Sequence, residues 1–197
     1  MAKNNAPVAK RAKALNVSPA VLGYNKKETH RNPKGNMRRK QSEYALQLNE
    51  KQKVKFVYGI QEKQFSNYYA KAEKMAGKSG ENLLVLCERR LDNVVYHLGF
   101  ASTRRQARQL VNHGHFLVNG KKADIPSMEL KAGDVVSVKA KSQSSPKFNE
   151  LKEMIITTPA WIDLNLDKFE GKIVRTPERA DIDLPIEEHY IVEFYSR

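Results

Sequence analysis

The chain has 197 residues, and its 35 lysines and arginines outnumber its 22 acidic residues, for a formal net charge of +13. This excess predicts a polyanionic partner, and nucleic acid is favoured over a membrane surface because the basic N-terminal segment has no large apolar face. No run approaches the roughly 18 apolar residues of a membrane span. The N-terminus lacks the apolar core of a secretory signal, so secretion is not expected. A single cysteine, Cys87, excludes an internal disulfide and a cysteine-based zinc site.

Residues 1–41 carry much of the positive charge, with eleven lysines and arginines against one acid, Glu28. Three prolines interrupt this segment, and it shows little apolar periodicity. We expect a short helix around Val8 to Leu15. The remainder is predicted to be a basic N-terminal arm that needs its partner for shape.

The pattern of residues 42–77 predicts helices. Asn49 and Gln52 offer a cap for the first, whose core candidates are Val54, Val57 and Tyr58. The second is amphipathic, with apolar side chains at helical spacing: Phe65, Tyr68, Tyr69, Ala72, Met75 and Ala76. Its aromatic side chains are expected to be core rather than platforms for stacked bases. We predict a helical lobe at 42–82, completed by about 173–197.

A further helix is predicted where the stretch 88–139 begins. Its apolar stripe recurs at i, i+3, i+4 and i+7, with two more members toward the N-terminus: Leu84, Cys87, Leu91, Val94, Val95 and Leu98. Gly99 follows, where a helix commonly ends in a left-handed residue that glycine takes without steric cost.

A short, two-faced helix comes next. Ser102 or Thr103 can cap it, and Gln106 can complete a capping box with Thr103. The apolar face holds Thr103, Ala107, Leu110 and Val111. The polar face holds Arg105, Arg108, Gln109 and Asn112, with Arg104 at its edge. Arginine presents a planar fork of donors that matches phosphate oxygens, so this face is a candidate phosphate contact, and a merely solvated helix face is the alternative.

A hairpin is predicted after this helix, which His113-Gly114-His115 ends. Phe116 and Val118 alternate on a strand, Asn119-Gly120 is the strongest short hairpin signal, and Lys121-Lys122 lead the return strand. The turn 131–134 then leads into a strand at 135–138. Beyond it, Phe148, Leu151 and Ile155 predict a short helix, and residues 161–166, 172–175 and 189–195 are predicted to be β-like.

Features of the common catalytic sites are missing. The chain has no glycine-rich phosphate loop, no His-x-x-x-His pair, and no nucleophile with its base. Acid pairs such as Asp181 and Asp183 lie in a hydrophilic segment, where solvated charges are the simpler interpretation. We expect a binding protein that is not an enzyme and needs no cofactor or metal.

Two levels of resemblance are carried by these residues. The central stretch RRLDNVVYHLGFASTRRQARQLVNHGHFLVNGKK resembles the alpha-L RNA-binding motif, a small fold that also occurs in enzymes. Together with the flanks SEYALQLNEKQKVKFVYGIQEKQF and GKIVRTPERADIDLPIEEHYIVEFYSR, it is similar to the family of the fourth small-subunit ribosomal protein of bacteria and organelles. The likeness covers roughly residues 38–197. Within that family, the chain resembles the cysteine-free branch, which lacks the zinc-binding cysteine cluster.

The resemblance implies an α+β fold. A helical lobe packs with the C-terminal segment, and a central lobe at 83–172, with the alpha-L motif at 88–139, is inserted between them. It also implies a structural constituent of the small ribosomal subunit, a primary ribosomal RNA-binding protein that nucleates assembly. The family helps to line the path by which messenger RNA enters and to maintain translational accuracy.

The implied partners are small-subunit ribosomal RNA at a junction in its 5′ domain, messenger RNA near that path, and neighbouring small-subunit proteins, including the fifth. No membrane partner is implied, and a cytoplasmic ribosome is favoured over an organellar one. The candidate RNA-binding residues are Arg38, Arg39, Lys40, Ser42, Tyr44, Lys51, Lys53, Lys55, Arg90, Arg104, Arg105, Arg108, Gln109, Asn112, His113, His115, Asn119, Lys121 and Lys122.

Two other functions remain open at this point. An RNA-modifying enzyme such as a pseudouridine synthase can carry the same small fold, but it would need a catalytic domain, and residues 140–197 are too short for one. A stand-alone RNA-binding regulator or stress factor on free subunits would not need the two matched flanks.

Overall fold

The computed structural model describes residues 7–24, 42–145, 148 and 157–196. Its helices and its antiparallel sheet confirm the α+β class. The chain divides into two compact units, Met1–Asn67 with Leu184–Arg197, and Tyr68–Asp183. The predicted lobe boundaries lie after residues 82 and 172, whereas the two compact units divide after residues 67 and 183; the predicted boundaries stay a proposal. The predicted helix through Leu151 and Ile155 lies outside the described residues.

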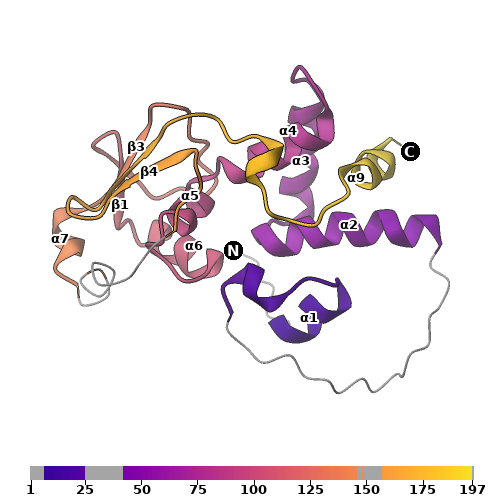
Figure 1. Ribbon diagram of the computed structural model, residues 1–197, viewed down its shortest axis with the longest axis horizontal. Helices are drawn as coiled ribbons and strands as arrows, with labels where there is room; N and C mark the ends of the chain where they lie inside the picture. The colour runs from indigo at the N-terminus through magenta and orange to yellow at the C-terminus, as the bar shows by residue number, and fades with distance from the viewer. Residues whose placement is uncertain (1–6, 25–41, 146–147, 149–156, 197) are drawn as a thin grey trace. The chain divides into compact units, whose positions relative to one another are not determined.

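The first unit is helical. Its elements are α1 (Val8–Ala14), the 3-10 helix η1 (Pro19–Leu22), α2 (Glu43–Tyr58), the beginning of α3 (Glu62–Glu73), and α9 (Glu188–Tyr195). Figure 1 shows α9 beside the long helix α2, so the C-terminal segment packs with the helical part of the chain, as expected.

Helix α2 begins earlier than its predicted cap. The Ser42 hydroxyl accepts a hydrogen bond from the Ala45 N–H at 3.3 Å, which satisfies one of the free donors of the first turn. Gly59, at φ +63°, ends the helix. The prediction of a cap at Asn49 or Gln52 is therefore wrong: both lie inside α2, because nothing between Glu43 and Tyr58 interrupts it.

The final segment is a helix, and the prediction of a β-like segment at 189–195 is wrong. The apolar residues of the run HYIVEFY are so closely spaced that they fit both the two-residue period of a strand and the 3.6-residue period of a helix. Packing on α2 selects the helix: Ile191 is fully buried, and Phe194 and Tyr195 follow it at i+3 and i+4. The Lys51 ammonium lies 3.9 Å from the centroid of the Phe194 ring, a cation–π contact.

Part of the predicted basic arm is folded. The expected helix around Val8 to Leu15 is confirmed by α1, which Leu15 ends. Ala12, Leu15, Val17 and Leu22 are buried, and the Arg11 guanidinium donates to Gln52 Oε1 on α2 at 3.3 Å. These residues therefore pack against other parts of the chain, and the prediction of an arm shaped by its partner stays a prediction for the rest of residues 1–41.

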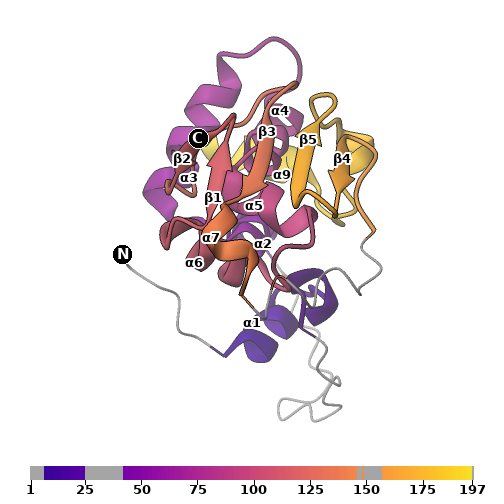
Figure 2. The ribbon, with the colours of Figure 1, turned by 90° about the vertical axis from the view of Figure 1, so that its left-hand side faces the viewer.

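The second unit contains the sheet. Its helices are the rest of α3, α4 (Ser79–Glu88), α5 (Leu91–His97), α6 (Arg104–Asn112), α7 (Ala140–Gln143) and the 3-10 helix η3 (Arg179–Asp181). The strands are β1 (Phe116–Val118), β2 (Lys121–Ala123), β3 (Val135–Val138), β4 (Ile162–Asn165) and β5 (Glu170–Ile173). They form one antiparallel sheet in the order β2-β1-β3-β5-β4, seen side by side in Figure 2.

The apolar stripe before Gly99 is divided between two helices. Arg89 ends α4 and Arg90 is extended, so Leu84 and Cys87 belong to α4 while Leu91, Val94, Val95 and Leu98 belong to α5 or its cap. All six side chains are fully buried. Burial raises the pKa of the Cys87 thiol well above its ordinary range, which fits a small buried hydrophobe.

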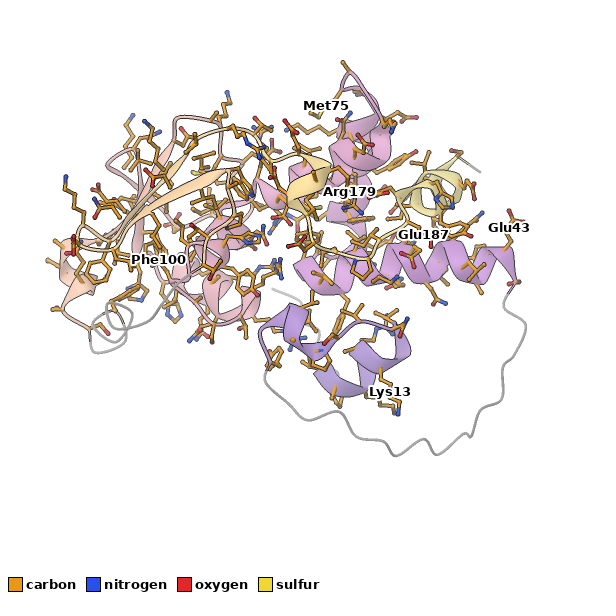
Figure 3. All side chains as sticks on the ribbon, viewed as in Figure 1. Lys13, Glu43, Met75, Phe100, Arg179 and Glu187 are labelled. Carbon is orange, nitrogen blue, oxygen red and sulfur yellow. The ribbon has the colours of Figure 1, made fainter. Side chains whose placement is uncertain are left out.

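One core joins α5 and α6 to a face of the sheet. Phe100, labelled in Figure 3, stacks on Phe116 of β1 with ring centroids 6.0 Å apart. Further along the sheet, Gly171 of β5 lies directly against Leu98, which belongs to the same core. A Cβ on Gly171 would lie only 2.0 Å from Leu98 Cδ2, so this close approach requires glycine.

Among the described residues, no helix is long and apolar enough to cross a membrane.

Candidate nucleic-acid interface

Helix α6 is fixed at its start by two side chains. Thr103 Oγ1 accepts from the Gln106 N–H at 3.1 Å, which confirms Thr103 as the cap. Gln106 Oε1 accepts from the backbone N–H and the hydroxyl of Ser102, both at 2.8 Å. In a capping box, the Gln106 side chain would accept from the Thr103 N–H; here it accepts from Ser102, the residue before. This bond ties the preceding loop to the helix.

The outer face of α6 is polar, as its pattern predicts. Ala107 and Val111 are fully buried in the core, whereas Arg105, Gln109 and Asn112 are exposed at i, i+4 and i+7. His113, also exposed, follows directly. We call Arg105, Gln109, Asn112 and His113 the α6 outer face. It presents hydrogen-bond donors in one row, the arrangement that can follow a phosphate backbone.

Two of the predicted RNA-binding arginines lie inside the protein. Arg90 is only 2% exposed; its guanidinium donates to both carboxylate oxygens of Asp92, at 3.0 and 2.8 Å, and to the Tyr68 hydroxyl at 2.8 Å. Arg104 donates to Asn93 Oδ1 at 2.6 Å and covers the Tyr96 ring. Their side chains stabilise the core beneath α6 rather than extend from its surface.

Asp92 joins α5 to α6. It is 2% exposed, and besides Arg90 it binds Arg108 of α6, whose Nε lies 2.7 Å from Asp92 Oδ2. Burial by itself lowers the pKa of Arg90, but the Asp92 charge and hydrogen bonds outweigh it and hold that pKa above its ordinary value. Arg108, expected on the open face, is therefore partly structural. The buried negative charge of Asp92 is therefore compensated, with Arg90 as its buried partner and Arg108 as a second one.

A second buried network lies beside the first. The Asn93 amide donates to Glu88 Oε2 at 2.5 Å, and His97 Nε2 lies 2.8 Å from the same carboxylate oxygen. Through Arg104 this network also reaches α6. Polar side chains buried in this way require matched partners, so they fix how α6 lies on α5 and which of its residues face outward.

The predicted hairpin is confirmed, but Asn119 has a structural role. Asn119 and Gly120 both have positive φ, +50° and +77°, as a type I′ turn requires. The Asn119 amide donates to Asp134 Oδ1 at 2.8 Å and accepts from the Val135 N–H at 2.9 Å, which ties the turn to β3. Lys121 and Lys122 on β2 remain exposed beyond this turn.

The end of α6 brings in a residue that the sequence pattern did not single out. Lys139 follows β3, and its backbone N–H donates to the His115 carbonyl at 2.9 Å, so its side chain starts beside the end of α6. The β1–β3 register, in which Phe116 pairs with Val138, is the signal that could have found it. His115 itself is half-buried, and its Nδ1 lies 2.9 Å from Ser142 Oγ.

In the first unit, the predicted lysines are paired with acids. Lys51 is 5% exposed and lies 2.9 Å from Glu62, Lys55 binds the same carboxylate, and Lys53 binds Glu50. Burial alone raises the pKa of Glu62, but hydrogen bonds and charges of Lys55 and Lys51 prevail and lower it to about 2.

The remaining predicted residues of that unit divide into three groups. The Ser42 side chain caps α2. The half-exposed Tyr44 lies against Phe194, with ring centroids 5.7 Å apart. Arg38, Arg39 and Lys40 lie outside the described residues. Within the part of the chain that is described, no group of three His, Cys, Asp or Glu side chains is placed to hold a metal ion.

Comparison with known proteins gives two family matches and several similar relatives. Residues 89–136 match the family described as the S4 domain, and residues 3–88 match the Ribosomal protein S4/S9 N-terminal domain. The chain is 60% identical over 163 residues to small ribosomal subunit protein uS4A of Clostridium acetobutylicum, covering 83% of this chain and 79% of that protein.

Two further relatives extend the comparison. Small ribosomal subunit protein uS4 of Halothermothrix orenii is 58% identical over 165 residues, 83% of this chain and 79% of the relative. The uS4 protein of Lachnospira eligens is 48% identical over 199 residues, the full length of both chains.

Proposed function

This chain belongs to the uS4 family of small ribosomal subunit proteins, and on that premise we propose that it is a structural constituent of the small subunit that binds ribosomal RNA directly. It binds early, before most other proteins, and so nucleates assembly. Its binding site is a junction of helices in the 5′ domain of the small-subunit RNA. Folded RNA of this kind is recognised largely through its shape and its phosphates.

The observation that carries the proposal is the α6 outer face. Arg105, Gln109, Asn112 and His113 are exposed in an S4 domain whose buried Asp92 network fixes the helix. A rigid row of donors can meet phosphates without the loss of side-chain freedom that a mobile row would suffer. The net charge of +13 adds long-range attraction to any RNA.

Sedimentation tests the ribosomal role. Tagged protein is expressed in a bacterial host, and ribosomes are dissociated and washed in high salt before gradient centrifugation. We expect the protein to remain with small subunits. Recovery only in the top fractions would instead favour a stand-alone RNA-binding factor. Binding of purified protein to a transcript of the 5′ domain, without other proteins, tests the early-binding role separately.

The resemblance supports a finer proposal for Arg38, Arg39 and Lys40. In the family this basic cluster lies toward the path by which messenger RNA enters, where cations can hold single-stranded phosphates and oppose duplex formation. Changing all three to glutamine should leave assembly near normal and slow translation through a structured messenger more than through an unstructured one. Equal slowing on both, or failed incorporation, would leave the cluster as an assembly contact. Neighbouring small-subunit proteins, including the fifth, and a part in decoding accuracy belong to the same proposal.

We also propose binding without catalysis, in the ribosome of a bacterial cytoplasm. The bacterial relatives support that location over an organelle. The functional groups at the α6 outer face are hydrogen-bond donors and one imidazole, with no paired base and nucleophile among them.

A further inference from the structure

The side chains of Lys122 and Lys139 lie close together at the end of α6, next to Gly114. Gly114 follows this helix with φ +73°, and an ideal Cβ built on it would lie 3.1 Å from Lys122 Cε. The same position is 3.7 Å from the Lys139 ammonium nitrogen and 3.9 Å from that of Lys122. Both positive charges therefore lie within 4 Å of a single place that glycine leaves open.

The fold itself brings the two lysines together. Lys122 lies on β2, opposite Leu117 of β1, and Lys139 follows β3 on the other side of β1. The Lys139 N–H bond to the His115 carbonyl holds the start of its side chain beside Gly114. The positive φ favours glycine at this position, and a Cβ there would also crowd the Lys122 side chain that passes over it.

The charges around this point do not balance. Lys122 forms an ion pair with Asp124 at 3.0 Å. The hydrogen bond from Lys122, then its charge, lowers the pKa of Asp124, and the Lys139 charge acts in the same direction. Among the described residues, no carboxylate lies within ion-pair distance of the Lys139 ammonium itself. In the described part of the chain, the two ammonium groups thus have one ion-paired carboxylate between them, Asp124, which binds Lys122.

Capping of the helix end is the simpler explanation for cations at this place, because the C-terminal end of a helix carries partial negative charge. Yet neither ammonium donates to a carbonyl of α6 in the part of the chain that is described. The turn closes without them: the Gly114 N–H donates to the Val111 carbonyl at 2.8 Å and that of His115 to Leu110 at 3.3 Å. In the described residues, the turn is thus closed by backbone bonds, and the ion pair of Lys122 is with Asp124 rather than with the helix end.

We propose that Lys122 and Lys139 form one phosphate-binding site above Gly114, at the end of the α6 outer face. A phosphate group offers several oxygens, each able to accept a charge-assisted bond from an ammonium at about 2.7–2.9 Å. Taken with the proposed function, on which this inference rests, the ligand is one backbone phosphate of ribosomal RNA. The site extends the row of donors from Arg105 to the edge of the sheet.

The test is the salt dependence of binding to a transcript of the 5′ domain of small-subunit RNA. Each phosphate contact contributes about 0.7–0.9 to the slope of log affinity against log salt. We expect Lys139→Gln to weaken binding and lower the slope. The double variant Lys122→Gln/Lys139→Gln should lose the slope of one phosphate only, because both lysines hold the same group. A double variant that loses twice that slope would mean two separate contacts and overturn the shared site.

Two matched variants complete the design. Lys172→Gln removes an exposed lysine of the same sheet that lies opposite Asp163, and it should leave the slope unchanged. Lys139→Arg keeps the charge and should bind like the wild type. If Lys139→Gln shifts the melting temperature, restored binding in Lys139→Arg still identifies charge as the cause, and failure to restore it refutes the site.

The outcomes distinguish failure of the phosphate site from failure of the proposed function. If the wild type binds and Arg105→Gln weakens binding while Lys139→Gln has no effect, the phosphate site is wrong and the proposed function stands. If the wild type does not bind the transcript at all, the proposed function fails, and this inference fails with it.

Discussion

At the scale of single residues, the α6 surface depends on side chains that never reach it. Asp92 has a fully buried partner in Arg90 and a second, part-exposed partner in Arg108. Losing Arg108 therefore leaves the Asp92 charge compensated, whereas losing Asp92 would leave Arg90 buried and unpaired. Buried charges without partners are among the costliest defects in a protein.

Arg105 and Arg108 should differ when each is replaced by alanine. Arg108→Ala removes a hydrogen bond to a buried carboxylate and should lower the free energy of unfolding by about 1.5–3 kcal/mol. Arg105→Ala changes an exposed side chain and should stay within about 0.5 kcal/mol of the wild type. Urea denaturation measures both. We expect Arg105→Ala to weaken RNA binding all the same, and equal stability losses in the two variants would contradict the buried role of Arg108.

The contact between Gly171 and Leu98 gives a second prediction. Gly171→Ala places a methyl group 2.0 Å from Leu98 Cδ2 and should cost about 1–3 kcal/mol of stability, as overpacking of a core does. Leu98→Ala removes the atoms that clash. In a double-mutant cycle the combined variant should therefore be more stable than the sum of the two losses, and simple additivity would show that the contact is not the cause.

At the scale of elements, local signals decided where prediction succeeded. The Asn119-Gly120 turn, the Thr103 cap and the stripe of α5 each involve neighbours in sequence, and the structure confirms them. Helix α9 was mistaken for a strand because its period is set by packing on α2, far away along the chain. Arg90, Arg104 and Lys51 are also buried because of contacts with other parts of the fold. The sequence pattern around a single cation does not show whether it will be buried or which side chain it will pair with.

Glu62 connects three elements, and its pKa predicts an acid-sensitive contact. It binds Lys51 and Lys55 of α2 and accepts from the Tyr195 hydroxyl of α9 at 3.1 Å. Its pKa is lowered from 4.5 to about 2. The stabilisation is therefore complete above about pH 4.5 and is lost as the pH falls toward 2.

Glu62→Gln should remove this dependence. The wild type should be more stable than the variant near neutral pH, and the difference should shrink as the pH falls through that window. Because Glu62 is half-exposed, the difference should be small. Melting temperatures at neutral pH, pH 4 and pH 2.5 provide the measurement, and a gap that stays constant with pH would refute the role of this carboxylate.

At the scale of the whole molecule, the two units differ in how the chain builds them. The second unit is one continuous segment, Tyr68–Asp183, and among the described residues its core cluster includes none from the C-terminal segment 184–196. The first unit joins Met1–Asn67 to Leu184–Arg197. Composition and charge indicated an RNA-binding protein, but neither indicates which segments share a unit, since that depends on contacts between distant parts of the chain.

Removing residues 184–197 should therefore affect the units unequally. Helix α2 would lose its contacts with α9, including the Gln47–Glu193 hydrogen bond at 3.0 Å and the Phe194 ring over Lys51. In limited proteolysis, cleavage within residues 42–67 should increase while residues 68–183 stay protected. Simultaneous loss of protection in both segments would show that the second unit also depends on the C-terminal helix.

The discontinuous first unit has a consequence for synthesis of the chain. Translation proceeds from the N-terminus, so α1 and α2 leave the ribosome before the second unit, and α9 leaves it after that unit. The segment 68–183 can complete its core while elongation continues, in the way that contiguous domains fold as units during synthesis. The unit that is begun first is thus completed after the second one, and α2 is left with its α9-facing surface uncovered until α9 has been synthesised.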